Sequence, residues 1–107
     1  MPGKPDGNLF SYERAAALLP EVRQLTEEAI ARLEQTQRSA AESSEQSIQS
    51  VVAGWADAMG DLGLEVKGLW LVDFDNGSGY YCWRYPEDGL QYFHTYEEGF
   101  RGRMRIQ

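Results

Sequence analysis

The sequence predicts an α+β fold in which an antiparallel helical hairpin packs on a three-stranded antiparallel β-meander. Apolar residues recur every three or four positions from Leu18 to Leu33 and again from Ile48 to Leu62, which is the period of a helix face. After Gly63 the period changes to two, as expected of strands. Two clusters of turn-forming residues, at 75–78 (Asp-Asn-Gly-Ser) and 86–89 (Pro-Glu-Asp-Gly), divide the remaining apolar segments into a meander.

The first helix is expected to begin after Ser11, whose hydroxyl is a good N-cap, and to end near Arg38. Its apolar face consists of Leu18, Val22, Leu25, Ala29 and Leu33. Pro20 interrupts this face, because proline lacks a backbone donor and restricts the residue before it. The segment is therefore either a short helix over 12–18 followed by a longer one, or one kinked helix.

The second helix follows a polar, serine-rich stretch at 35–50, part of which must turn the chain. Ser43 or Ser44 is its expected N-cap, and Gly60 and Gly63 supply its end. Its apolar face consists of Ile48, Val51, Val52, Trp55, Met59 and Leu62. Neither helix can bury its apolar face alone, so we expect the two to pack as an antiparallel hairpin.

Three strands are predicted at 69–74, 80–85 and 90–94, and residues 65–67 offer a short lead-in strand. One face of the meander is expected to carry Trp70, Val72, Phe74, Tyr81, Trp83, Leu90, Tyr92 and His94. The other is expected to carry Leu69, Leu71, Asp73, Tyr80, Cys82, Arg84, Gln91 and Phe93. The helical hairpin can cover only one of these faces. The second is either an exposed surface for a partner, or covered by the N-terminal segment or by the tail at 97–107.

The register behind these faces assumes that both turns contain four residues. Val72 then lies opposite Tyr81, and Tyr81 lies opposite His94. Cys82 points to the other face of the sheet, so Cys82 and His94 cannot share a metal ion or form a thiolate–imidazole pair. On this basis we expect no metal site, no cofactor and no catalytic residue.

Asp73 is the residue in the predicted strands that most needs a partner, because an unpaired buried carboxylate is costly. One interpretation is a structural ion pair with Lys67, Arg84 or Arg103. The sharper interpretation is a small polar pocket. Its candidate binding residues are Glu65, Lys67, Asp73, Arg84, His94 and Arg103.

Length and composition limit the remaining possibilities. The 107 residues, 42% of them hydrophobic, suit one domain at 10–107 after a flexible lead-in at 1–9. The net charge of −7 argues against nucleic-acid binding, and no apolar run has the length of a membrane span. With one cysteine and no apolar signal-peptide core at the N-terminus, we expect a cytoplasmic protein.

Four segments occur in an order that resembles the bacterial and archaeal family DUF2203, a domain of unknown function. They are ERAAALLPEV, GLEVKGLWLVDF, YYCWR and QYFHTYEEGFRGR, and together they extend over most of 10–103. The positions that match the family's motifs are Leu18, Leu19, Pro20, Glu65, Val66, Lys67, Val72, Asp73, Phe74, Cys82, Trp83, His94, Gly99, Phe100, Gly102 and Arg103. Departures occur at Gly68, Asp75, Pro86 and Phe93. The resemblance supports the fold and implies no activity.

Two functions are compatible with these observations. The first is a non-enzymatic binding or assembly module that associates with itself, as a homodimer or larger, or with another protein. The alternative is a small enzyme or ligand-binding protein with a polar pocket around Asp73 and His94.

Overall fold

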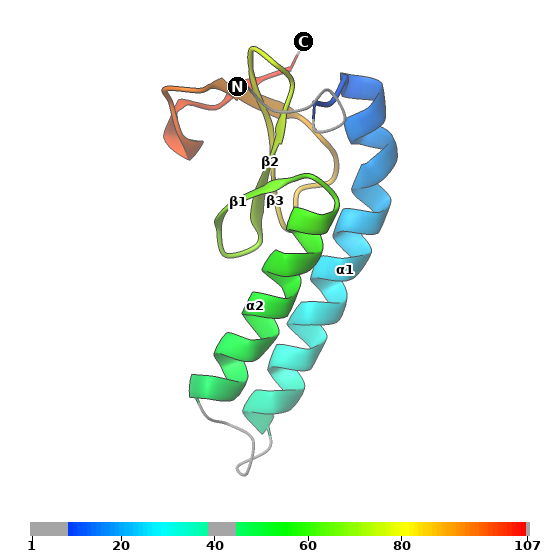
Figure 1. Cartoon of the computed structure of the whole chain (residues 1–107), viewed down its shortest axis with the longest axis vertical. Helices are drawn as coiled ribbons and strands as arrows, with labels where there is room; N and C mark the ends of the chain where they lie inside the picture. Colours follow the sequence, from blue (N-terminus) through cyan, green and yellow to red (C-terminus); the bar gives the residue numbers. More distant parts are fainter. Residues whose placement is uncertain (1–8, 39–44, 107) are drawn as a thin grey trace.

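The described residues, 9–38 and 45–106, form a helical hairpin and one antiparallel sheet in this computed structural model (Figure 1). The elements are α1 (Tyr12–Arg38), α2 (Glu45–Asp61), β1 (Glu65–Gly68), β2 (Leu71–Asp75), β3 (Gly79–Arg84), β4 (Tyr92–Thr95), the short 3₁₀ helix η2 (Phe100–Gly102) and β5 (Met104–Arg105). The sheet order is β1-β2-β3-β4-β5, so each strand pairs with its neighbours in sequence. The predicted α+β class is confirmed, whereas the predicted count of three strands is wrong because the sheet has five.

The two additional strands lie at the edges of the sheet. β1 corresponds to the short lead-in strand expected at 65–67, and β5 was not predicted because two residues show no alternation. Most of the predicted flexible lead-in and the predicted N-cap at Ser43 or Ser44 fall on residues 1–8 and 39–44, outside the described residues.

α1 is one helix in spite of Pro20. It begins as predicted, because the Ser11 hydroxyl accepts a hydrogen bond from the backbone N–H of Arg14 at 3.1 Å. Pro20 lies on the exposed side, so its ring displaces no core side chain. The alternative of one segment that continues to Arg38 is therefore the one that the chain adopts.

The two helices pack through the predicted apolar faces and one polar contact. Val22 and Met59 are fully buried at this interface, and Trp55 is 4% exposed. The Thr26 hydroxyl, also fully buried, donates to the carbonyl of Val22 at 2.8 Å and accepts from the indole N–H of Trp55 at 2.9 Å. This hydroxyl satisfies the buried indole and links α1 to α2.

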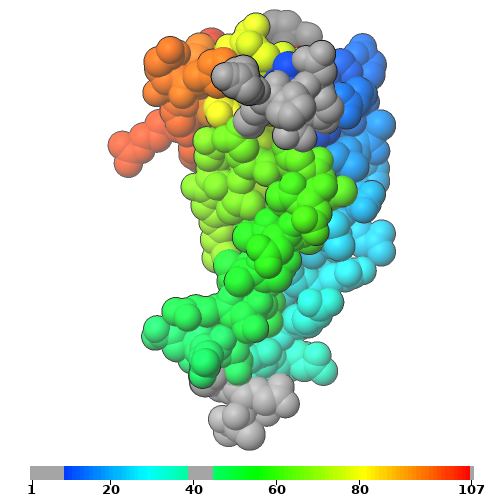
Figure 2. All heavy atoms as spheres, in the orientation of Figure 1, coloured from blue at the N-terminus to red at the C-terminus, as the bar shows by residue number. Residues whose placement is uncertain are grey.

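The helical hairpin extends well beyond the sheet (Figures 1 and 2). At its far end the two helices pack on each other, and the sheet does not reach them (Figure 1). Apolar side chains there, such as Leu33, Ile48 and Val51, are only half-buried. At the near end, Gly63 adopts φ +91°, and the N–H of Leu64 donates to the carbonyl of Met59 at 3.0 Å. This confirms the predicted helix stop. No helix among residues 9–38 and 45–106 combines the length and apolar character needed to cross a membrane.

The turn between β2 and β3 is shorter than predicted. The N–H of Asn76 donates to the carbonyl of Gly79 at 2.9 Å, so only residues 77–78 lie between paired positions. Val72 therefore pairs with Trp83, two positions later than predicted. Because side chains alternate with a period of two, this shift leaves every side chain of both strands on its predicted face.

The connection between β3 and β4 has the larger consequence. Tyr81 pairs with Phe93 instead of His94, a shift of one residue, and one residue moves every β4 side chain to the other face. The prediction that Cys82 and His94 lie on opposite faces is therefore wrong. That prediction was the reason for excluding a shared metal ion and a thiolate–imidazole pair. Neither exclusion now has a structural basis.

The loop at 85–91 explains this register. It is held by side chains as well as by backbone: the Trp83 indole donates to the carbonyl of Glu87 at 2.9 Å, and the Glu87 carboxylate accepts from the N–H of Arg84 at 2.9 Å. Arg23 of α1 donates to the same Glu87 carbonyl. These bonds fold the loop at 85–91 around Glu87. The predicted four-residue turn at 86–89 therefore does not form.

The helices cover one face of the sheet, and the C-terminal segment lies on the other side (Figure 1). Val72, Phe74 and Trp83 join the helix residues in the core. On the second face, the guanidinium of Arg103 lies 4.0 Å from the ring centroids of both Tyr92 and Phe100. This arrangement agrees with the alternative in which the tail covers part of the second face.

The Thr26 contact yields a stability prediction. We expect Thr26→Val to lower the free energy of unfolding by about 1–3 kcal/mol, because the buried Trp55 N–H loses its acceptor. Thr26→Ser is the matched control, since it keeps the hydroxyl and removes one methyl group. Urea denaturation followed by tryptophan fluorescence measures both variants, and equal stability of the two would contradict the role of the hydroxyl.

Candidate functional site

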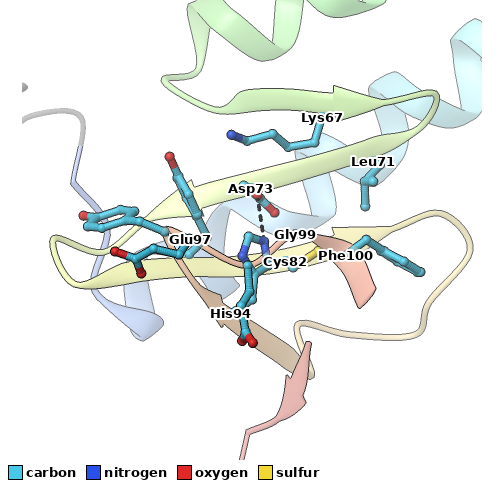
Figure 3. Close-up of a pocket in the computed structure, with 11 residues that line it drawn as sticks. Lys67, Leu71, Asp73, Cys82, His94, Glu97, Gly99 and Phe100 are labelled. Atoms are coloured by element: carbon cyan, nitrogen blue, oxygen red, sulfur yellow. Dashed lines mark hydrogen bonds and ion pairs between the residues drawn. The ribbon is translucent and has the colours of Figure 1, made fainter. Parts of the chain in front are cut away.

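Three side chains of different chemistry converge on the second face of the sheet. Asp73 on β2 pairs directly with Cys82 on β3, and His94 on β4 pairs with Tyr80, two positions from Cys82. One carboxylate oxygen, the thiol sulfur and one ring nitrogen all lie within 4.8 Å of one another. The three side chains point toward each other (Figure 3) and are 1%, 1% and 3% exposed, respectively. We refer to Asp73, Cys82 and His94 as the cluster.

Local sequence explains how the three strands bring the cluster together. Alternation places residues 73 and 82 on the face away from the helices, because their neighbours Val72 and Trp83 are in the core. Gly79 lets β4 approach closely, since a Cβ atom at this position would lie 2.6 Å from the backbone oxygen of His94. Any larger residue at 79 would push this part of β4 away.

The hydrogen bonds of His94 define its proton positions. Nδ1 lies 2.8 Å from the carbonyl oxygen of Thr95, and Nε2 lies 2.9 Å from Oδ2 of Asp73. A carbonyl oxygen only accepts, so Nδ1 carries a hydrogen. Nε2 then either donates to a carboxylate as part of an imidazolium or accepts from a protonated carboxyl. In both cases Asp73 and His94 share one proton.

The two oxygens of Asp73 differ sharply in their surroundings. Oδ2 contacts His94, whereas Oδ1 is buried and has no hydrogen-bond partner with standard geometry. The Cys82 thiol, a weak donor, lies within 4.8 Å of one of the two carboxylate oxygens. Burial raises the pKa of Asp73 above its usual range, although His94, Cys82 and Lys67 act in the opposite direction.

Cys82 is a neutral thiol near neutral pH. Burial, together with the neighbouring carboxyl of Asp73, raises its pKa to about 12. Arg103 acts in the opposite direction, with Nη1 at 3.9 Å from the sulfur, but it does not compensate for burial. The guanidinium is engaged by Glu87 at 2.8 Å, which reduces its effect on the thiol.

A pocket of about 320 Å³ opens over the cluster, between the sheet and the C-terminal segment (Figure 3). Its other walls include Lys67, Tyr80, Tyr96, Glu97, Glu98 and Phe100. Three of these side chains are aromatic and two are acidic. The pocket therefore combines flat apolar walls with a negative rim and a buried polar floor.

The six residues predicted to form a polar site are only partly brought together. Asp73, His94 and Lys67 line the pocket. Glu65 lies at its side, where it contacts Lys67 at 3.1 Å and accepts from the Tyr80 hydroxyl at 3.0 Å.

The two predicted arginines do not line this pocket. Arg84 is exposed, with its guanidinium 5.5 Å from the ring centroid of Phe100. Arg103 pairs with Glu87 and fastens the tail, so neither arginine is the partner of Asp73. The partner of Asp73 is His94, which the sequence analysis had placed on the other face.

Sequence reasoning missed Cys82 as a member of the cluster and Tyr96, Glu98 and Phe100 as pocket walls. The Cys82 error came from the β4 register alone. Of the two glycines near Phe100, Gly102 lies close to the Glu98 side chain, whereas a Cβ atom at Gly99 would meet nothing within 4 Å. Nothing in the local pattern indicated what the close approach at Gly102 would enclose.

Comparison with known proteins bears on the family and not on the activity. The family model described as "Uncharacterized conserved protein (DUF2203)" matches residues 8–106. Neither a curated protein nor a solved structure matches the chain. Because the matched segment is nearly the whole chain, the protein belongs to the DUF2203 family.

Proposed function

We propose that the protein binds a small, hydrogen-bond-donating or cationic ligand in the pocket over the cluster. The observation that carries this proposal is the buried Asp73–His94 pair at the floor of a pocket of about 320 Å³. Buried ionisable groups cost free energy, and when they line a pocket they mark it as a candidate functional site. A largely pre-formed pocket with a few convergent polar groups is the usual form of a ligand site.

The charges around the pocket favour a positively charged or donor-rich ligand. Glu97 and Glu98 are exposed acids on its walls, whereas the Asp73–His94 pair on the floor has no net charge because the two groups share one proton. Lys67 is the basic group among the described lining residues, and its ammonium is already paired with Glu65 at 3.1 Å. An incoming cation therefore meets more negative than positive charge.

The aromatic walls of the pocket further limit the chemical class of ligand that would bind there. Tyr80, Tyr96 and Phe100 present rings on the pocket surface, and Tyr80 packs on Tyr96 with ring centroids 5.1 Å apart. Aromatic rings attract flat groups and cations through their faces. The chain's own cations already use two of these rings, since Lys67 lies 4.7 Å from the ring centroid of Tyr80 and Arg103 lies 4.0 Å from that of Phe100. A flat cation, such as an amidinium or a guanidinium on a ring, has the same chemistry and also matches the acidic rim.

A cysteine nucleophile is the less favoured chemistry for this site. A thiol whose pKa lies at about 12 is almost wholly protonated near neutral pH, and the thiolate is the reactive form. The Nε2 atom of His94, which would have to act as the base, is engaged by Asp73 at 2.9 Å. The arrangement therefore favours binding over thiol catalysis.

Self-association is a second candidate function. Leu69 on the β1–β2 turn is 56% exposed, and it lines a shallow hollow with Leu71, Phe100 and the charged Arg84. Exposed apolar side chains that gather in one place are typical of interaction surfaces. The tail lies over part of the face on which this prediction was based, so the remaining support is this smaller patch.

The ligand class can be tested with two probes of matched shape. Benzamidine and benzoate have the same ring, but one carries a donor-rich cation and the other an acceptor-only anion. We expect benzamidine, in the presence of EDTA, to shift the ¹⁵N–¹H resonances of Tyr80, Tyr96 and Phe100 saturably. Benzoate should leave them unchanged, because the acidic rim repels it.

Two variants show whether the pocket is responsible. Glu97→Gln combined with Glu98→Gln should weaken the benzamidine response without affecting the core, since both acids are exposed. Asp57→Asn, on the exposed side of α2, is the control and should respond like the unaltered protein. An equal response to both probes, or no response to either, would overturn the proposal.

Cys82 should behave as a buried thiol. We expect iodoacetamide to alkylate it at least about 100-fold more slowly in the native protein than in concentrated guanidinium chloride near neutral pH. Mass spectrometry of quenched samples, with EDTA present, gives both rates. Native alkylation as fast as that of the unfolded chain would indicate an activated nucleophile instead.

Self-association predicts a mass above that of one chain. Light scattering after gel filtration should give about twice 12.1 kDa or more at high protein concentration. Leu69→Asp should return the mass to that of the monomer while the circular dichroism spectrum stays unchanged, because this side chain is exposed. A mass of 12.1 kDa at every concentration would rule out this candidate.

A further inference from the structure

We infer that the cluster of Asp73, Cys82 and His94 is a binding site for a divalent transition metal ion of the zinc type. This inference deepens the proposed function, and it rests on that function in taking the pocket as the functional site. The ion would form the floor of the pocket, with three ligands from the protein. The fourth position would be left for water or for the ligand of the pocket.

The donor set is the first argument. A thiolate, an imidazole and a carboxylate are the three side-chain ligands that zinc takes in proteins. The presence of sulfur favours zinc and its neighbours over magnesium or calcium, which prefer oxygen ligands alone. Three protein ligands with an open position are typical of zinc sites that act on a bound molecule, whereas purely structural sites have four.

The spacing of the donor atoms is the second argument. Tetrahedral ligands at about 2.0–2.3 Å from zinc lie about 3.3–3.8 Å from one another. The three donor atoms of the cluster already lie within 4.8 Å of one another, and they belong to three adjacent strands of one sheet. The strand pairing therefore already holds the three donors near one another, and any pair farther apart than about 3.8 Å would have to move closer to share an ion.

The unpartnered oxygen of Asp73 is the third and independent argument. Asp73 is 1% exposed, and its Oδ1 has no hydrogen-bond partner among the described residues. A buried polar atom without a partner costs about 1–3 kcal/mol, and more when the group is charged. A cation within the cluster gives this one oxygen a partner, while Oδ2 already has His94.

The orientation of His94 is already that of a metal ligand. Its Nδ1–H donates to the carbonyl of Thr95 at 2.8 Å, which leaves Nε2 directed at the cluster. Metal-ligating histidines nearly always use the second ring nitrogen in this way, because the bond fixes the tautomer and the ring plane. On metal binding, the proton that Asp73 and His94 share leaves to solvent, and Nε2 and the carboxylate turn to the ion.

The raised pKa of Cys82 does not prevent the thiol from binding a metal ion. A bound zinc ion removes the proton from a coordinating thiol outright, and the proton leaves to solvent. Arg103 lies 3.9 Å from the sulfur, and Glu87 balances it through contacts of 2.8 and 3.1 Å. Lys67 lines the same pocket, and Glu65 balances it at 3.1 Å. The net charge facing the cluster is therefore not repulsive to a metal ion.

Cobalt(II) provides a direct test, because it replaces zinc and is coloured. We expect the full chain, stripped of metal, to bind one equivalent of Co²⁺ with a thiolate-to-cobalt charge-transfer band and the intense visible bands of four-coordinate cobalt. Zn²⁺ should then displace it. Cys82→Ser should abolish the charge-transfer band, and His94→Gln and Asp73→Asn should weaken cobalt binding at least about 100-fold.

Asp57→Asn is the matched control for Asp73→Asn, since Asp57 is an exposed acid on α2 and should leave the spectrum unchanged. Circular dichroism checks that each variant is folded, and Cys82→Ser decides the test if Asp73→Asn does not fold. A missing charge-transfer band, or a band that survives Cys82→Ser, would overturn the metal site.

The cobalt and benzamidine experiments can contradict the metal site and the small-ligand function separately. A benzamidine response in EDTA without any cobalt spectrum overturns the metal site alone. A cobalt spectrum without any benzamidine response, with or without metal, overturns the small-ligand function and supports the metal site.

Discussion

The pairing of β4 with β3 is the constraint on which the candidate site depends. Phe93 on β4 pairs with Tyr81 on β3, and both side chains point to the helix side of the sheet. The next residue, His94, therefore lies on the same face as Asp73 and Cys82. Had the strand slipped by one residue, His94 would point toward the helices and the carboxyl of Asp73 would be buried with no imidazole beside it. The same slip would place Phe93 on the second face. The three side chains of the cluster therefore meet only in the observed register.

Glu87 holds this register from outside the site. Its backbone carbonyl accepts from the Trp83 indole and from Arg23 of α1, so the loop before β4 is bound to both the sheet and the helices. Its carboxylate binds Arg103, which carries the C-terminal segment over the second face. One loop residue thus connects the helical hairpin, the strand that brings His94 and the wall of the pocket. The pocket is a product of the whole fold and not of the meander alone.

Sequence reasoning could reach the parts of this structure that depend on local patterns. The helix start at Ser11, the stop at Gly63 and the alternation through Val72 and Phe74 each follow from one or two residues and their neighbours. The Asn-Gly turn was recognised, and its misjudged length did no harm because the error was two residues. The β3–β4 connection was different, because side chains distant in sequence set its geometry. An error of one residue there placed Cys82 and His94 on opposite faces of the sheet, whereas they lie on the same face. Arg103 was recognised as a candidate ion-pair residue, but its partner Glu87 could not be identified without that loop.

The composition of the second face argues that the cluster serves something other than stability. Replacing a buried ionic group by apolar residues of similar volume is often neutral or stabilising by about 1–4 kcal/mol. The opposite face of the same strands follows that logic, with Val72, Phe74 and Trp83 fully buried. The second face instead buries a carboxyl, a thiol and an imidazole together, and leaves one carboxylate oxygen without a partner. A chain of this size has little stability to spare, and the cost of this arrangement supports our proposal that a ligand completes it.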